Sequence, residues 1–143
     1  MYEKSDFLAK KAVIKELEIR GYTECKTISK PADIIGYLND ERYYFEVKMT
    51  RKKEKYFGAA TLTEWEQAIK DPKHFYFVVV IQNNEIIEKI IFYKPEEFIK
   101  ISSIPPFKVY FNLDLNKGIK DKNKITFEQL KNMIDFYHEI TKS

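Results

Sequence analysis

The sequence predicts an α/β domain with a mixed β-sheet. The first observation is a helical pattern followed by three strand-like segments within residues 5–49, which is typical of a helix joined to antiparallel strands. The second is a further helix signal at residues 63–70. The third is the apolar run FYFVVVIQ at residues 75–82, which is typical of a strand buried on both faces. A hairpin-rich start joined through a helix to a buried strand predicts both parallel and antiparallel strand pairs.

The predicted first helix begins at Ser5, a residue type that caps helices, and ends at Gly21. Its apolar residues recur at helical spacing and are expected to face the core: Phe7, Leu8, Val13, Ile14 and Leu17. Strands are expected at residues 22–28, 32–38 and 43–49. The turn-forming residues 39–42 join the second of these strands to the third.

The predicted second helix starts with a capping box formed by Thr63 and Glu66, and it stops at Asp71-Pro72. Trp65 lies on its apolar face and is expected to anchor the core. The small residues 58–60 before it indicate a mobile connection. The elements expected after the buried strand are a strand at 85–93, a short helix from Pro95, a strand at 108–113 and a helix capped by Thr126.

The composition is that of an ordinary globular protein, with 44% hydrophobic and 33% charged residues among 143. No linker or repeat divides the chain, so we expect one domain over residues 1–143, with a core at about 5–82 and an extension at 83–143. The single cysteine, Cys25, excludes an intramolecular disulfide framework. The sequence has neither a signal peptide nor a membrane-spanning apolar run, so we expect a soluble, cytoplasmic protein with no membrane partner.

The net charge of +3 is concentrated in one short segment. Residues 48–55, KMTRKKEK, hold five basic residues and one acidic residue, so they carry +4 and the rest of the chain carries −1. We expect this segment to contact phosphate groups of a nucleic acid, on either side of a phosphate bound next to Lys48. The alternative is a solvated charged surface. The residues expected to bind nucleic acid are Arg51, Lys52, Lys53 and Lys55.

The most informative pattern is PAD, ending at Asp33, followed after twelve residues by EVK, which spans Glu46 to Lys48. If Asn39 and Asp40 form a two-residue turn, Asp33 lies opposite Glu46 in the hairpin. If all four loop residues are unpaired, Asp33 lies opposite Lys48. Opposed residues share a face, and so do alternate residues of a strand, so both registers place the three polar side chains on one face.

Two carboxylates beside an ammonium group can support phosphodiester hydrolysis. Carboxylate oxygens suit Mg²⁺, which usually keeps waters that a substrate phosphate can replace. A metal ion there would polarise the phosphate and acidify a bound water, and we expect it to lower the pKa of Lys48. Lys48 would orient the nucleophile or stabilise developing negative charge. The alternative interpretation is a solvated hairpin surface.

On these residues the chain resembles the PD-(D/E)xK, or restriction endonuclease-like, nuclease superfamily. The order helix, three strands, helix, strand is similar to the core of that superfamily. Residues 20–51 look like archaeal Holliday-junction resolvases, and LTEWEQA followed by FYFVVVI looks like the nuclease-like C-terminal domains of the NO VEIN family. The resemblance covers about residues 5–82 and implies a restriction endonuclease-like core with a C-terminal strand and helix extension.

The resemblance also implies roles for individual residues. Asp33 and Glu46 would bind Mg²⁺, which Mn²⁺ can replace, with the Val47 carbonyl as a further ligand, and Lys48 would be catalytic. Relatives often carry a metal-site glutamate early in the first helix, where this chain reads FLAK at residues 7–10.

Two further residues are accessory candidates. Glu16 is the nearest glutamate on the first helix, although it sits late and can instead pair with Arg20, four residues on. Gln67 would face the site, as a glutamine does in some relatives, or else be a surface amide.

The expected function is therefore that of a Mg²⁺-dependent DNA endonuclease, with a homodimer as a further expectation. Which form of DNA it cuts stays open, as does activity on RNA. The alternative is a non-catalytic module that keeps the nuclease fold and binds nucleic acid or mediates assembly. In the assembly alternative, an aromatic surface of Phe107, Tyr110 and Phe111 would form the subunit interface.

Overall fold

The structure is a computed structural model that describes residues 2–103, 108–118 and 126–141. The helices are α1 (Tyr2–Ile19), α2 (Leu62–Lys70), the short 3₁₀ helix η1 (Pro72–His74), α3 (Pro95–Lys100) and α4 (Phe127–Thr141). The strands are β1 (Thr23–Thr27), β2 (Ile34–Leu38), β3 (Glu41–Thr50), β4 (Lys55–Thr61), β5 (Phe75–Asn83), β6 (Ile86–Tyr93), β7 (Ser102–Ser103) and β8 (Lys108–Asp114). Among the described residues, no helix is long and apolar enough to cross a membrane.

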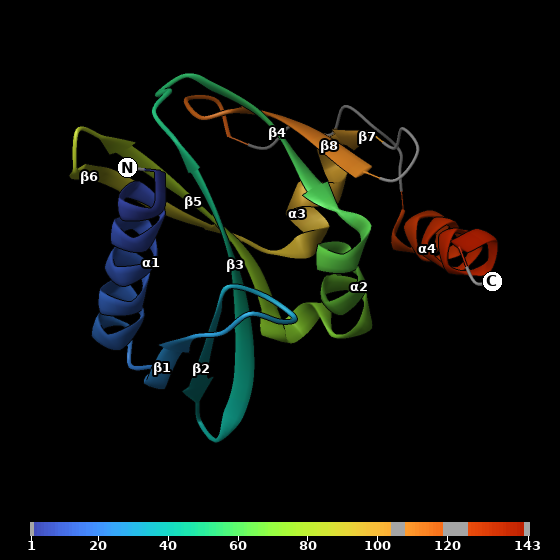
Figure 1. Ribbon diagram of the computed structural model, residues 1–143, viewed down its shortest axis with the longest axis horizontal. Coiled ribbons are helices and arrows are strands. Elements are labelled where there is room, and N and C mark those ends of the chain that lie inside the picture. Colours follow the sequence, from blue (N-terminus) through green and yellow to red (C-terminus); the bar gives the residue numbers. More distant parts are fainter. Residues whose placement is uncertain (1, 104–107, 119–125, 142–143) are drawn as a thin grey trace.

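The strands form two sheets, which Figure 1 shows on either side of α3. The main sheet has the order β1-β2-β3-β5-β6, in which β3 and β5 are parallel and the other pairs are antiparallel. The second sheet has the order β4-β8-β7 and is antiparallel. The predicted α/β class with a mixed sheet is confirmed. The restriction endonuclease-like order of helix, three-strand antiparallel meander, helix and strand is also present, with β4 inserted before α2.

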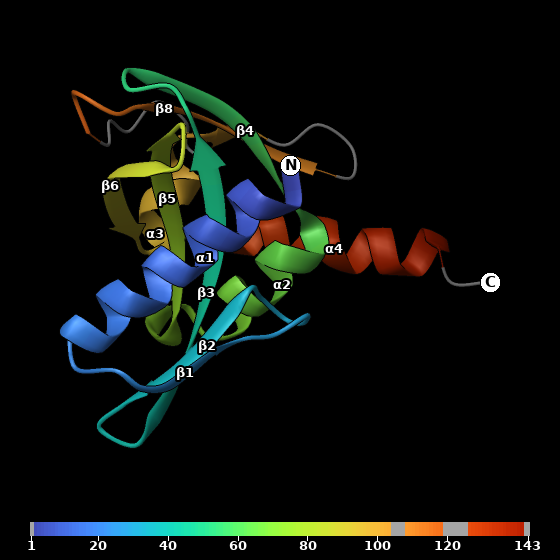
Figure 2. The same ribbon diagram turned by 60° about the vertical axis from the view of Figure 1, so that its left-hand side comes forward.

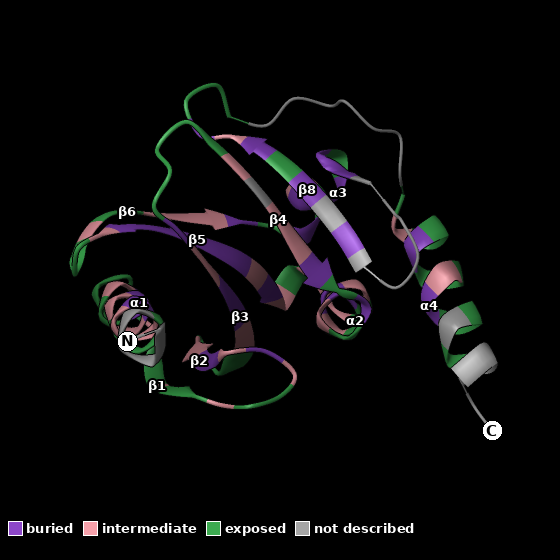
Figure 3. Cartoon of the chain, turned by 45° about the horizontal axis from the view of Figure 1, so that its top comes forward, coloured by how far each residue is buried: buried purple, intermediate pink, exposed green. Residues whose placement is uncertain are grey.

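Helices cover both faces of the main sheet, so two hydrophobic clusters form (Figures 1 and 2). The side chains of β5 alternate between them. Val78 and Val80 pack with residues of α1, whereas Phe77, Val79 and Ile81 pack with residues of α2, α3 and the second sheet. Figure 3 shows β5 buried along most of its length. The FYFVVVIQ run is apolar because both of its faces are covered.

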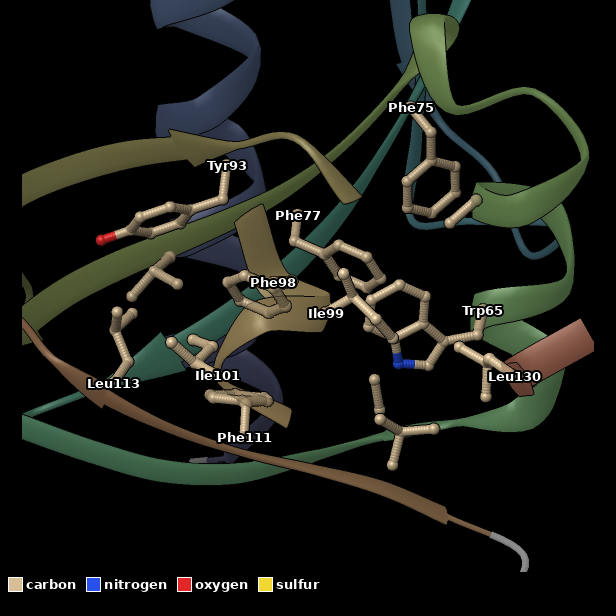
Figure 4. Close-up of a cluster of buried hydrophobic side chains, with 14 of the residues drawn as sticks. Trp65, Phe75, Phe77, Tyr93, Phe98, Ile99, Ile101, Phe111, Leu113 and Leu130 are labelled. Atoms are coloured by element: carbon tan, nitrogen blue, oxygen red, sulfur yellow. The ribbon is translucent and has the colours of Figure 1, made fainter. Parts of the chain in front are cut away.

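The larger cluster is rich in aromatic side chains (Figure 4). Phe77 and Phe98 stack with ring centroids 4.6 Å apart, and Trp65 is fully buried beside Phe77. Phe111 is 1% exposed and packs on Phe98, so it belongs to the core and is not available for the expected aromatic surface. Phe107 and the side chain of Tyr110 lie outside the described residues.

The first helix differs from its prediction at its N-terminus. It begins at Tyr2 and therefore does not start at Ser5. Phe7 was expected to face the core but is 62% exposed, because the buried stripe consists of Ala9, Val13 and Leu17. These residues are four apart and lie on one face of the helix. The helix ends as predicted before Gly21, whose φ of +101° favours glycine.

Residues 58–60 form part of strand β4, so the expectation of a mobile connection was wrong. Gly58 is paired with Phe111 of β8. A Cβ atom at Gly58 would lie 2.7 Å from Phe111 Cζ. The glycine therefore leaves room for a core aromatic ring, and this role of a small residue has no local sequence signal.

His74, in the η1 turn, joins two segments by polar contacts. Its Nδ1 lies 3.0 Å from Asp71 Oδ1, and its Nε2 lies 3.0 Å from Glu41 Oε2. The hydrogen bonds to Asp71 and Glu41 hold the pKa of His74 above its usual value. The contact with Glu41 fixes the start of β3 against the turn that precedes β5.

Candidate active site

The β2–β3 hairpin has the two-residue turn that places Asp33 opposite Glu46. Asn39 and Asp40 both have positive φ, at 52° and 64°, which is the requirement of a tight hairpin turn. Leu38 pairs with Glu41, and the ladder continues to Ile34 and Phe45. Asp33 follows in register at the open end of the hairpin, where its N–H donates to the Phe45 carbonyl at 3.1 Å. The alternative four-residue loop is excluded.

Alternate residues of β3 lie on opposite faces of the sheet. Phe45 and Val47 belong to the cluster under α1. Glu46 and Lys48 point the other way, toward α2, where both contact Glu64. The carboxylate of Asp33 reaches back to the same part of β3, and its Oδ2 accepts a hydrogen bond from the Val47 N–H at 2.9 Å.

An open cavity of about 300 Å³ lies between the β1–β2 connection and helix α2. Figures 1 and 2 show this connection extending toward α2. Its lining comes from three segments: residues 29–33, Glu46, and residues of 61–70 on and before α2. Asp33, Glu46 and Glu64 therefore share one cavity. Lys48 does not line the cavity itself, but its ammonium group contacts the carboxylates of Glu46 and Glu64, which do.

Glu64 is the residue of this site that the sequence analysis missed. Helix α2 is capped by Thr61, and its capping box pairs Thr61 with Glu64. The predicted pair, Thr63 with Glu66, was two residues too late. Glu64 Oε1 accepts from the Thr61 N–H at 2.8 Å and from Lys48 Nζ at 3.0 Å. One carboxylate thus caps the helix and holds the predicted catalytic lysine.

The charges of the three central groups depend on one another. Glu46 is 5% exposed, and its burial together with the neighbouring Glu64 raises the pKa of Glu46 well above its usual range. Burial acts against ionisation of Glu64 too, but contacts with Glu46, Lys48 and the Thr61 N–H hold its pKa low. Burial alone would lower the pKa of Lys48, yet the two carboxylates outweigh it and raise that pKa. The lowered pKa expected for Lys48 presupposed a neighbouring cation.

A second lysine approaches the site from helix α1. Lys10 Nζ lies 3.5 Å from Asp33 Oδ1 and 3.1 Å from Asp6 Oδ2. The spacing of Asp6 and Lys10 indicates an ion pair on the helix. The contact with Asp33 joins residues 23 positions apart and has no local signal.

The two accessory candidates have different positions. Gln67 lines the cavity beside Glu64. Glu16 lies elsewhere on α1, and its Oε2 accepts from Arg20 Nε at 2.8 Å, which is the alternative interpretation.

The basic segment is farther from the cavity than expected. Arg51 follows the end of β3, five residues beyond Glu46, which corresponds to about 16 Å along an extended strand. Lys53 pairs with Glu88 of β6 at 3.2 Å. The lysines that line the cavity are instead Lys30 and Lys70.

The donor set suits a hard divalent cation. Within the described part of the chain, no three His, Cys, Asp or Glu side chains are grouped so as to hold a metal ion by themselves. Mg²⁺ is usually bound by only one or two carboxylates together with water and substrate phosphate. The carboxylates of Asp33 and Glu46, which share one open cavity, fit that requirement.

Comparison with solved structures gives a similarity to Hjc, a Holliday junction resolvase from the archaeal hyperthermophile Archaeoglobus fulgidus. The two chains are 18% identical, with a TM-score of 0.47, and the match covers 74% of this chain and 88% of that chain. No curated protein matches the sequence.

Comparison with protein families gives a match to the family described as "Protein NO VEIN, C-terminal". The match spans residues 6–92, which is 87 of the 143 residues. The matched region starts in α1 and ends in β6. It includes the carboxylates and lysines described above: Lys10, Asp33, Glu46, Lys48 and Glu64. The chain therefore belongs to the NO VEIN C-terminal family.

Proposed function

We propose that this protein is a nuclease that uses a divalent cation to hydrolyse phosphodiester bonds in DNA. The observation that carries the proposal is the meeting of Asp33, Glu46 and the Lys48–Glu64 pair at one open cavity. Lys30 and Lys70 line the same cavity and would attract a phosphate chain. The roles expected for Asp33, Glu46 and Lys48 are thus supported by their positions around one cavity, since the sequence motif alone does not require such a cavity.

Asp33 and Glu46 would hold the cation, Mg²⁺ or Mn²⁺, and the Val47 carbonyl is a further proposed ligand. The bound cation would supply Lewis-acid stabilisation of the charge on a substrate phosphate. The Val47 N–H donates to Asp33 Oδ2 at 2.9 Å and so orients that carboxylate. Glu46 projects from β3 toward α2, and its burial there restricts the position of its carboxyl group.

Lys48 would act as the electrostatic partner of the reacting phosphate. Its ammonium group is largely buried, with 14% of the side chain exposed, and is held by Glu64 at 3.0 Å. A preorganised ammonium stabilises negative charge that develops on phosphate oxygens without further rearrangement. Glu64 is a positioning residue in this proposal, since it acts through Lys48. Gln67 would offer an amide to the phosphate or to the attacking water.

The DNA backbone would contact two groups of positively charged side chains. Lys30 and Lys70 would bind phosphates at the cavity. The segment with Arg51, Lys52, Lys53 and Lys55 would form a second contact beyond the end of β3, where Arg51 lies about 16 Å from Glu46 along the strand. Phosphate contacts of this kind position a substrate without reading its sequence.

The test is a cleavage assay on duplex, single-stranded and four-way branched DNA, each with Mg²⁺, Mn²⁺ or EDTA. The wild-type protein is expected to cut at least one form with a cation, and EDTA should abolish the reaction. Glu46→Gln and Lys48→Met are each expected to reduce the rate about 100-fold or more.

The matched control is Glu66→Gln, which makes the same side-chain substitution at the same cavity. The Glu66 carboxylate lies 2.8 Å from His138 Nε2, and the proposal gives it no role in binding the cation or in positioning Lys48, so near wild-type cleavage is expected. Full activity of Glu46→Gln would refute the assigned site. Salt-sensitive DNA binding with no cleavage under any cation would refute the nuclease proposal in favour of a binding module.

A further inference from the structure

Both carboxylate oxygens of Asp33 have partners within the protein. Oδ2 accepts from the Val47 N–H at 2.9 Å, and Oδ1 lies 3.5 Å from the ammonium group of Lys10. The side chains of Lys10 and Asp33 are about equally buried, at 23% and 24% exposure. Lys10 of α1 therefore places a positive charge beside Asp33, the carboxylate that would bind the metal ion in the proposed function.

Lys10 has a second anionic partner on its own helix. Asp6 Oδ2 lies 3.1 Å from Lys10 Nζ, and the Asp6 side chain is 58% exposed. The two residues are one turn apart, a spacing at which side chains on a helix meet. The ammonium group thus lies between a partly buried carboxylate at the cavity and a more exposed one outside it.

We propose that Lys10 is an exchangeable counter-ion for Asp33. Its ammonium group neutralises Asp33 while no divalent cation is bound, and it moves to Asp6 alone when a cation takes its place. This inference rests on the proposed function only in assigning a cation to Asp33.

The exchange requires little rearrangement. Lys10 already contacts both carboxylates, so a change in side-chain torsions is sufficient to break one contact and keep the other. Ion pairs of partly exposed groups contribute little to stability, so the cation can displace the lysine. Lys10 consequently reduces the apparent affinity for the cation, and Asp6 restores part of it by offering the displaced ammonium group another partner.

The experiment is titration calorimetry of the 143-residue protein with Mn²⁺. Lys10→Met is expected to bind Mn²⁺ about two- to fivefold more tightly, the range that corresponds to the measured strength of partly exposed ion pairs. Lys11→Met is the matched control, because Lys11 is the exposed neighbour and its replacement removes the same charge. Asp33→Asn should abolish this binding and so locate it at the cavity.

Asp6 separates an exchange from a general effect of charge. Asp6→Asn is expected to weaken Mn²⁺ binding in the wild-type background and to have no effect in the Lys10→Met background. An equal effect of Asp6→Asn in both backgrounds would show that the carboxylate acts directly on the cation, and it would overturn the proposal. So would Lys10→Met that binds no more tightly than Lys11→Met, or an absence of Mn²⁺ binding in all variants.

These outcomes are independent of the cleavage assay. If Lys10→Met tightens Mn²⁺ binding while the wild-type protein cuts no DNA, the counter-ion role stands and the nuclease proposal fails. If the wild-type protein cuts DNA but the Lys10 and Lys11 variants bind Mn²⁺ equally, the nuclease proposal stands and the counter-ion role fails.

Discussion

Replacement of Glu64 should destabilise the protein more than loss of a helix cap can explain. Glu64 Oε1 accepts from the Thr61 N–H at 2.8 Å and from Lys48 Nζ at 3.0 Å. The lysine and glutamate side chains are 14% and 23% exposed, so water replaces this contact poorly. Glu64→Leu removes the acceptor for both donors and leaves the ammonium group with Glu46 at 3.6 Å.

The structure gives the expected size of each effect. Thr61→Ala removes the hydroxyl that accepts from the Glu64 N–H at 3.2 Å, and loss of such a cap costs about 1 kcal/mol. Glu64→Leu keeps that bond, because its donor is the backbone N–H, but it removes the acceptor of the Thr61 N–H, a comparable loss of about 1 kcal/mol. It also deprives Lys48 of a charged hydrogen bond, which contributes about 1.5–3 kcal/mol. We therefore expect Glu64→Leu to cost about 2.5–4 kcal/mol in total.

Urea unfolding at pH 7, followed by fluorescence of the single tryptophan, measures these differences, because Trp65 is buried on the same helix. Adding Lys48→Met to Glu64→Leu should recover the share that arises from the lost hydrogen bond of the ammonium group, since the double variant no longer buries that group. The reasoning would be refuted if Glu64→Leu cost no more than Thr61→Ala, or if Lys48→Met gave no relief in the Glu64→Leu background.

Three other predictions concern the fold, its pH dependence and DNA binding. Gly58→Val should lower the free energy of unfolding by about 1–3 kcal/mol because its side chain would overlap Phe111, and a thermal melt unchanged from wild type would contradict this. The raised pKa of His74 means that its contribution to stability is full below about pH 6.5 and is lost as the pH rises through the higher folded-state value. The stability difference between wild type and His74→Gln in urea should therefore be larger at pH 5.5 than at pH 9, and an equal difference would count against the ion pairs of His74. Lys30→Ala and Lys70→Ala should each weaken DNA binding and reduce the slope of log affinity against log salt by about 1, whereas unchanged slopes would show that the cavity does not contact phosphates.

The central residues of the site could be predicted because their relation is local. Asp33 and Glu46 are joined by one hairpin, and either of the two turn lengths placed them on one face with Lys48. The turn residues Asn39 and Asp40 accept positive φ, and this property selected the observed register. The long apolar run of β5 likewise identified a central strand.

The rest of the site depends on tertiary packing. Thr61 with Glu64 and Thr63 with Glu66 fit the same capping pattern, and only packing of α2 against β3 selects the first pair. Lys10 approaches Asp33 only because α1 lies across the sheet.

Small residues and charge runs also carry little directional information. Glycine has a low intrinsic preference for strands, yet Gly58 lies in β4, where it pairs with Phe111 of β8 and leaves room for the Phe111 ring. The basic segment is close to Lys48 in sequence, but an extended strand carries it away from the cavity.

The most direct test is the rate of DNA cleavage by wild type and Glu46→Gln, compared at equal fractions of bound DNA in the presence of Mg²⁺. The proposed site predicts cation-dependent cleavage by the wild-type protein, with Glu66→Gln close to it. It also predicts that Glu46→Gln is about 100-fold slower or more while its DNA binding is unchanged. Equal cleavage by wild type and Glu46→Gln would contradict the account.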